Sequence, residues 1–221
     1  MQPCVGKELT LKRLWVAVVT IGALTTAGSV PTGAQSQPSN MPSANDRVTI
    51  SGWALSMSNV ATGANQTIKI DINKWSSPAQ RKMLIETFLE KKQDGLLSAL
   101  EKQPEMGRFN FPGYMGPDPN NTMRLGTDIR YAMNFPGEDG GRRIVIITPR
   151  IIGFREEVNK PRTYDYPFTL FELHFKNDGK GEGKMAYATA INFDKKTNRI
   201  ELENYSSEPV RLNNLVLEKK K

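Results

Sequence analysis

The sequence predicts an α+β fold: a curved, mainly antiparallel sheet, either a sandwich or a partly closed barrel, covered by one helix or a helix pair. Three observations lead to this prediction. Segments in which apolar and polar residues alternate recur at short spacing, as in half-buried strands. Turn signals rich in Gly, Asn and Asp separate most of these segments. One stretch near the start of the folded region instead carries apolar residues at helical spacing.

The first predicted elements are two strands and a helix. Arg47–Met57 has strand character, and Thr67–Trp75 alternates isoleucine with polar residues. Ser77-Pro78-Ala79-Gln80 is a helix start signal, with Ser at the N-cap, Pro at the first helical position and Gln three residues after the cap. Asp94 can cap a second short helix that Pro104 ends. The apolar stripe of the first helix consists of Leu84, Ile85, Phe88 and Leu89.

A long loop, Met106–Asn121, is predicted next because the segment is rich in Gly, Pro and Asn. The rest of the chain reads as antiparallel strands joined by short turns, which favours a sandwich or a partly closed barrel. The continuous apolar run Ile144–Ile147 is typical of a central strand. The predicted strands are Arg124–Phe135, Arg143–Pro149, Phe168–Lys176, Lys184–Asp194, Ile200–Tyr205 and Val210–Leu217.

The N-terminal residues have the layout of a secretory signal peptide. A positive region containing Lys7, Lys12 and Arg13 precedes the uncharged run Leu14–Ala27, and small residues follow. We expect Ala34 to be the last leader residue, with Ala27 as the alternative. The other interpretation is a membrane anchor, but this run is shorter than the roughly 20 apolar residues that a spanning helix needs.

The predicted organisation therefore has three parts. Residues 1–34 form a signal peptide, residues 35–46 form a disordered linker, and residues 47–221 form a single globular β-rich domain. The expected location of the cleaved protein is secreted or periplasmic, with no transmembrane span in the mature chain.

The cysteine content and the charge exclude several classes of function. Cys4 is the only cysteine and precedes the apolar run, so the cleaved protein has no disulfide, zinc–cysteine site or thiol nucleophile. The whole chain has 30 Lys and Arg against 23 Asp and Glu, a net charge of +7. These charges are scattered, whereas a nucleic-acid-binding protein usually has a basic stripe with aromatic residues between the charges. We expect no nucleic-acid partner.

His174, the only histidine, and Glu172 are weak candidates for a catalytic pair. They share one face of a predicted strand, about 7 Å apart. They are either an acid/base pair, two metal ligands, or two solvent-facing side chains. A metal site needs further ligands at defined spacing, and none is evident, so we predict no metal and no cofactor. Because two carboxylates suffice for glycoside hydrolysis, a secreted carboxylate-dependent hydrolase is an alternative function.

Two loops are stronger candidates for ligand binding. The first places aromatic side chains in a Pro-Gly loop, where exposed rings anchor a sugar, a peptide or a protein; its residues are Phe109, Phe111 and Tyr114. The alternative is that this loop folds back on the core. The second loop combines charge with tyrosine, in Arg162, Tyr164 and Asp165. Its alternative is a surface ion pair between Arg162 and Asp165.

From Asp139 onward, the stretch DGGRRIVIITPRIIGFREEVNKPRTYDYPFTLFELHFKNDGKGEGKM, followed by RIELENY, resembles a group of secreted bacterial proteins of unassigned function. The resemblance implies a bacterial envelope or extracellular setting and transfers no site residue. We therefore expect a non-catalytic secreted or periplasmic protein that binds a small ligand or an envelope protein. The alternatives are the hydrolase above and a structural subunit of an envelope complex.

Overall fold

In the computed structural model the described residues are 41–56, 65–114, 125–137, 140–152, 168–187, 190–194, 199–203 and 210–220. Within these ranges the chain forms one helix and eleven strands. The expected signal peptide, residues 1–34, lies outside the described residues, as do residues 35–40 of the expected linker.

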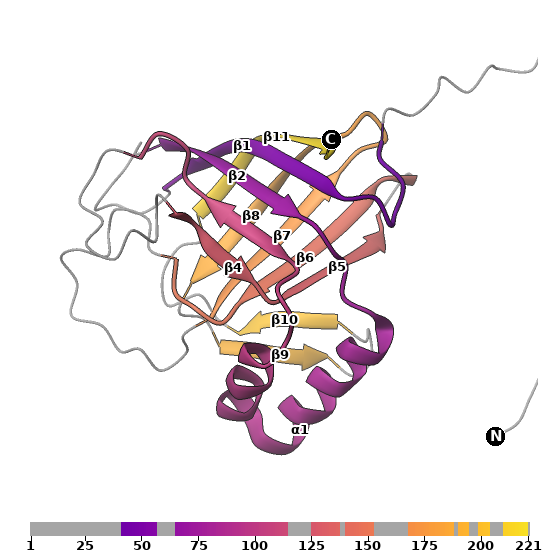
Figure 1. Ribbon diagram of the computed structural model, residues 1–221, viewed down its shortest axis with the longest axis vertical. Helices are drawn as coiled ribbons and strands as arrows, with labels where there is room; N and C mark the ends of the chain where they lie inside the picture. The colour runs from indigo at the N-terminus through magenta and orange to yellow at the C-terminus, as the bar shows by residue number, and fades with distance from the viewer. Residues whose placement is uncertain are drawn as a thin grey trace, which may run out of the picture. The chain divides into compact units, whose positions relative to one another are not determined.

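Nine strands form one antiparallel sheet that curls into a nearly closed barrel (Figure 1). Its strand order is β4-β3-β2-β1-β11-β8-β7-β6-β5. The strands are β1 (Val48–Leu55), β2 (Asn65–Ile72), β3 (Gly107–Asn110), β4 (Thr127–Ile129), β5 (Tyr131–Pro136), β6 (Arg142–Thr148), β7 (Thr169–Phe175), β8 (Lys180–Tyr187) and β11 (Val210–Lys219). The predicted α+β fold is confirmed. Of the two arrangements that the sequence left open, the observed one is the partly closed barrel.

Alternating residues of the strands turn inward and fill the barrel. Ile68, Ile70 and Ile72 of β2 are fully buried, whereas Lys69 and Asp71 between them face outward. Aromatic rings from β3 and β7 meet in the same interior, and the ring centroids of Phe109 and Phe171 lie 5.0 Å apart. Burial of these apolar side chains is the main stabilising contribution, since the chain has no disulfide.

Helix α1 (Pro78–Glu101) covers the outer face of β5, β6 and β7. The predicted start is confirmed: the amide of Gln80 donates to Ser77 Oγ at 3.2 Å, and the Ser77 amide donates to Gln80 Oε1 at 2.8 Å. The helix is kinked at Lys92, where φ is 56°. The predicted helix pair is therefore one element with a kink two residues before Asp94. Its buried stripe, Leu84, Phe88, Leu96 and Leu100, packs on Tyr131, Val145, Ile147, Phe168 and Leu170.

Three segments differ from the sequence-based expectation. The expected loop Met106–Asn121 begins with β3, which pairs with β2. The expected strand Arg124–Phe135 is divided at Arg130 into β4 and β5. The expected strand Lys184–Asp194 ends as β8 at Tyr187, and its remainder forms β9 (Ala190–Asp194), which pairs with β10 (Arg199–Glu203). Strand β9 lies beside α1 (Figure 1).

The segment 41–46, expected to belong to a disordered linker, lies along the domain. The guanidinium of Arg142 donates to the carbonyl of Pro42. The Asn134 side chain donates to the carbonyl of Ala44 at 3.1 Å, and Trp75 Nε1 donates to the carbonyl of Asp46 at 2.8 Å. The folded part of the chain therefore begins before Arg47.

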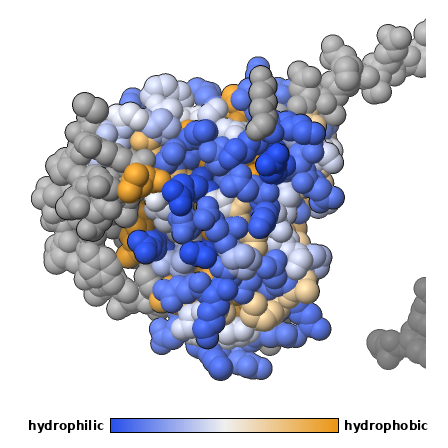
Figure 2. Space-filling view, in the orientation of Figure 1, coloured by the Kyte–Doolittle hydropathy of each residue, from blue (hydrophilic) through white to orange (hydrophobic). Residues whose placement is uncertain are grey.

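The face of the domain seen in Figure 2 is mostly hydrophilic, as expected where the outward positions of strands are polar. Small groups of apolar residues interrupt it. Among the described residues, no helix has the length and apolar character needed to cross a membrane.

Candidate functional site

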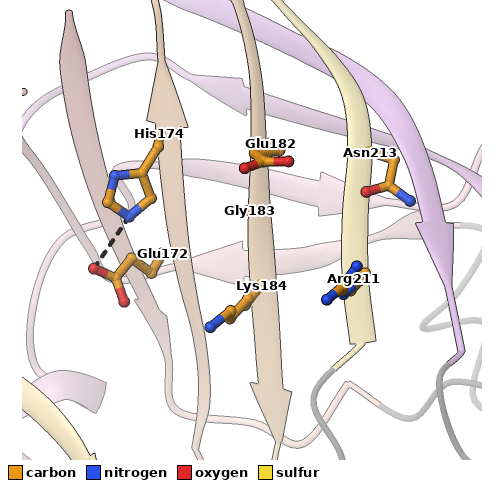
Figure 3. A pocket seen from close by; sticks show the side chains of 7 residues that line it. All are labelled: Glu172, His174, Glu182, Gly183, Lys184, Arg211 and Asn213. Carbon is orange, nitrogen blue, oxygen red and sulfur yellow. Dashed lines mark ion pairs between the residues drawn. The ribbon is translucent and has the colours of Figure 1, made fainter. Parts of the chain in front are cut away.

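The outer face of β7, β8 and β11 carries an open pocket of about 200 Å³ (Figure 3). We call it the outer-face pocket. Gly183 lies in it between charged and polar side chains. These side chains are Glu172 and His174 on β7, Glu182 and Lys184 on β8, and Arg211 and Asn213 on β11.

The strand register sets these six side chains in two rows across the sheet. Glu172 pairs with Lys184, which pairs with Arg211. In the second row His174 pairs with Glu182, and Asn213 follows on β11, where the register with β8 shifts. Side chains two residues apart on a strand point to the same face, so both rows face outward, as Figure 3 shows. The residues between them, Leu173 and Leu212, point into the core.

Glu172 is the most tightly held group of the pocket. Its Oε1 lies 2.6 Å from Nε of Arg143 on β6 and 3.3 Å from Nε2 of His174. Burial by itself raises the pKa of Glu172, but the Arg143 hydrogen bond and charge, with His174, outweigh burial and bring the pKa below its usual value. Glu172 is therefore a carboxylate that stays ionised through the neutral range.

This electrostatic environment bears on the catalytic hypothesis for Glu172 and His174. The predicted proximity of the two side chains is observed, on the convex outer side of the barrel. A general acid of a glycosidase needs a raised pKa, whereas Arg143 lowers that of Glu172. Glu172 therefore does not fit the role of general acid that the hydrolase hypothesis would give it. In the described part of the chain, no group of three or more His, Asp and Glu side chains is arranged to hold a metal ion.

Lys184 and Arg211 are the two cations of the pocket, and neither has a carboxylate partner within the described ranges. They lie opposite each other on β8 and β11, and both are exposed. Two other cations of the sheet do pair with carboxylates: Lys69 with Asp71 at 3.1 Å, and Arg108 with Asp128 at 3.0 Å. Among the described side chains, no carboxylate lies within 4.0 Å of Lys184 Nζ or the Arg211 guanidinium. Like charges directly opposite each other destabilise a sheet, so an anion between them would be bound favourably.

The structure places the first predicted binding loop largely in the core. Phe109 and Phe111 are 1% and 2% exposed, and their rings meet edge to face with centroids 4.8 Å apart. Tyr114 is half-buried against the same cluster. The expectation that Phe109 and Phe111 form an exposed anchor is therefore wrong. Alternation in β3 turns Phe109 inward, and the turn that follows carries Phe111 over the barrel interior.

The second predicted binding loop, with Arg162, Tyr164 and Asp165, lies outside the described residues. Of the predicted site residues, Glu172 and His174 line the outer-face pocket.

Reasoning from the sequence missed Lys184, Arg211, Glu182 and Asn213. The sequence indicates that these side chains face outward, because glycine or leucine lies next to each of them along its strand. The sequence does not indicate that they lie near Glu172, since β8 and β11 are separated in the chain by the β9–β10 hairpin. Only the pairing of these distant strands assembles the pocket.

Comparison of the chain with models of known protein families, with curated proteins and with solved structures finds no match.

Proposed function

We propose that the protein is a non-catalytic binding protein of the bacterial envelope or exterior, and that the outer-face pocket binds a small anionic ligand. One observation carries the proposal of an anion: the exposed, opposed cations Lys184 and Arg211 have no carboxylate partner among the described residues. A guanidinium beside an ammonium suits a carboxylate or phosphate group, which accepts charge-assisted hydrogen bonds from both.

Binding rather than catalysis is supported by the state of Glu172. A carboxylate held ionised by Arg143 orients its neighbours and does not donate a proton at neutral pH. The location is supported by the sequence of the leader and by the resemblance to secreted proteins. N-terminal sequencing of the native product tests it: a start at Gln35, or at Gly28 for the alternative site, is expected, and a cytosolic product starting at Met1 would contradict export.

Calorimetric titration of the cleaved protein with phosphate and with acetate tests the pocket. We expect the double variant Lys184→Gln/Arg211→Gln to bind at least about tenfold more weakly, which corresponds to about 1.4 kcal/mol. The double variant Lys82→Gln/Lys91→Gln removes the same charge from the exposed side of α1 and should bind like the wild type. Equal affinity of the first variant and the wild type, or no binding of either anion, would refute the proposal.

A further inference from the structure

We propose that the ligand of the outer-face pocket is an acidic sugar, and that Trp53 is the surface on which its ring stacks. This inference rests on the proposed function, because it assumes that Lys184 and Arg211 bind the acidic group. It adds a residue from β1 and names a chemical class of ligand.

Trp53 lies on the outer face of the sheet next to the pocket. It is 48% exposed, whereas its neighbours Gly52 and Ala54 are buried. The register of β1 and β11 pairs Trp53 with Asn213, which lines the pocket. Paired residues of neighbouring antiparallel strands have Cβ atoms about 4.5–5.5 Å apart, so Trp53 and Asn213 are neighbours on the sheet.

A β-bulge of β11 lies opposite this position. Between Ser51 and Trp53 the two steps along β1 oppose three steps along β11, from Val216 to Asn213, and Gly52 faces this bulge. A Cβ atom at Gly52 would lie 2.7 Å from Leu215 Cδ2 and 3.0 Å from the carbonyl oxygen of Asn213. Glycine therefore permits the close approach of the two strands there, and bulges of this kind direct side chains at functional sites.

The indole continues one row of the pocket toward β1. That row runs from Trp53 through Asn213 and Glu182 to His174 across four adjacent strands. The neighbouring row holds the charges of Arg211, Lys184 and Glu172. The outer face thus carries three features side by side: a flat apolar side chain, a row of neutral and acidic polar groups, and a row with two cations that have no carboxylate partner in the described part of the chain.

These three features match the three parts of an acidic sugar. The C–H face of a pyranose ring packs on the electron-rich face of an indole. Its hydroxyl groups donate to the Glu182 carboxylate and exchange hydrogen bonds with the Asn213 amide. Its carboxylate binds Arg211 and Lys184.

Charge and size favour a singly charged sugar over a nucleotide. The pocket and Arg143 contribute three cations against the two carboxylates Glu172 and Glu182, so one positive charge is left over. A polyphosphate would bring several negative charges against these carboxylates. The pocket volume of about 200 Å³ is smaller than the roughly 300–1,000 Å³ of sites that enclose a drug-sized molecule, so it suits the charged end of a ligand whose ring lies outside on Trp53.

The test uses calorimetric titration of the cleaved protein with methyl glucuronide, methyl glucoside, acetate and uridine monophosphate. We expect the glucuronide to bind more tightly than the other three. Trp53→Ala should weaken glucuronide binding about tenfold and leave acetate binding unchanged, because stacking involves only the ring. Trp53→Phe should keep most of the affinity. As a control, Val216→Ala truncates an exposed apolar residue of β11. This variant should bind the glucuronide like the wild type.

The outcomes separate the two proposals. If no probe shows binding that depends on Lys184 and Arg211, the proposed function fails and this inference fails with it. If acetate binds through the two cations but Trp53→Ala leaves glucuronide affinity unchanged, only the acidic-sugar inference is overturned. Tighter binding of uridine monophosphate through Trp53 would also overturn it, in favour of a nucleotide. Thermal unfolding of each variant establishes that it is folded.

Discussion

The charge state of Glu172 depends on a residue of the neighbouring strand. In the sequence its evident neighbour is His174, two positions away on the same strand face. In the folded protein its strongest partner is Arg143 on β6, whose guanidinium also lies over the ring of Phe135, 5.6 Å from the centroid. The side chains of Arg143 and Glu172 are 15% and 32% exposed, so solvent screens their attraction only in part.

At the residue scale we expect Arg143→Gln to raise the pKa of Glu172 and to lower the free energy of unfolding at neutral pH. The loss should be about 1–2 kcal/mol, between the values typical of exposed ion pairs and of hydrogen bonds to charged groups. Carboxyl NMR titration measures the pKa, and urea unfolding measures the stability. As a control, Lys82→Gln removes the exposed Lys82–Glu86 pair, whose charged atoms are 3.8 Å apart, and should change stability by less than about 0.5 kcal/mol.

The pH dependence of this effect has a definite sign. The pKa of Glu172 is lower in the folded state than its reference value of 4.5. The Glu172 carboxylate therefore binds a proton more weakly in the folded state than in the unfolded state. The stabilisation is therefore fully present above the unfolded pKa and is lost as the pH falls through the folded pKa. The stability difference between wild type and Arg143→Gln should shrink on acidification. A difference that stays constant would contradict the assigned ion pair.

Among the elements, α1 combines a start that follows the sequence rule with an interior that breaks it. The capping box at Ser77 and Gln80 forms as the sequence predicts. At Lys92 the backbone takes φ 56° and ψ −149°, a region that is strained for a residue with a side chain. The kink divides the buried stripe, with Phe88 before it and Leu96 after it, so that both parts pack against the same cluster.

At the element scale we expect Lys92→Gly to stabilise the protein by about 1 kcal/mol, because glycine adopts this backbone conformation without a steric penalty. Glu90→Gly, two residues earlier at an exposed helical position, should instead destabilise it by about 1 kcal/mol. Urea unfolding of the two variants should show shifts of opposite sign. Destabilisation by Lys92→Gly as large as that by Glu90→Gly would show that the backbone at Lys92 is helical.

On the scale of the whole domain, the segment 41–46 ties the start of the folded chain to β5 and β6. Its carbonyl groups accept hydrogen bonds from Trp75, Asn134 and Arg142. Arg142 is only 8% exposed, so its guanidinium depends on protein acceptors. The ion pair between Asp46 and Lys219, 3.0 Å apart, ties the same segment to the last strand.

We therefore expect removal of residues 1–46 to lower the free energy of unfolding by about 2 kcal/mol or more, since it leaves buried donors without acceptors. Removal of residues 1–40 should have little effect on that value. The urea midpoint of both truncated proteins provides the measurement. Arg142→Met should lower the free energy of unfolding less in the chain lacking residues 1–46 than in the chain lacking residues 1–40. The reason is that the shorter chain already lacks the Pro42 carbonyl, which accepts the hydrogen bond from Arg142. Equal stability of the two truncated proteins would contradict a stabilising role for the contacts of residues 41–46.

Elements with a long, regular pattern could be predicted, and short or irregular ones could not. The alternation of β2 identifies that strand and its buried face. The predicted stripe identifies α1, but of its four residues only Leu84 and Phe88 are buried, and Leu89 is 39% exposed. Strand β3 was missed because it has only four residues and begins with Gly107, which sequence rules assign to a loop. A Cβ at Gly107 would lie 2.0 Å from the carbonyl oxygen of Asp71, so the close pairing of β3 with β2 requires this glycine.

The sequence by itself determined the fold class, the helix start and the polar outer face of β7, because these depend on local periodicity and capping. The tertiary structure decided which strands are neighbours. It placed Lys184 opposite Glu172 and Arg211 opposite Lys184. It also placed Arg143 against Glu172, and the aromatic rings of Phe109 and Phe111 inside the barrel. The physical reason is that hydrogen bonds between strands join residues far apart in the chain, and periodicity within one strand carries no information about its partner.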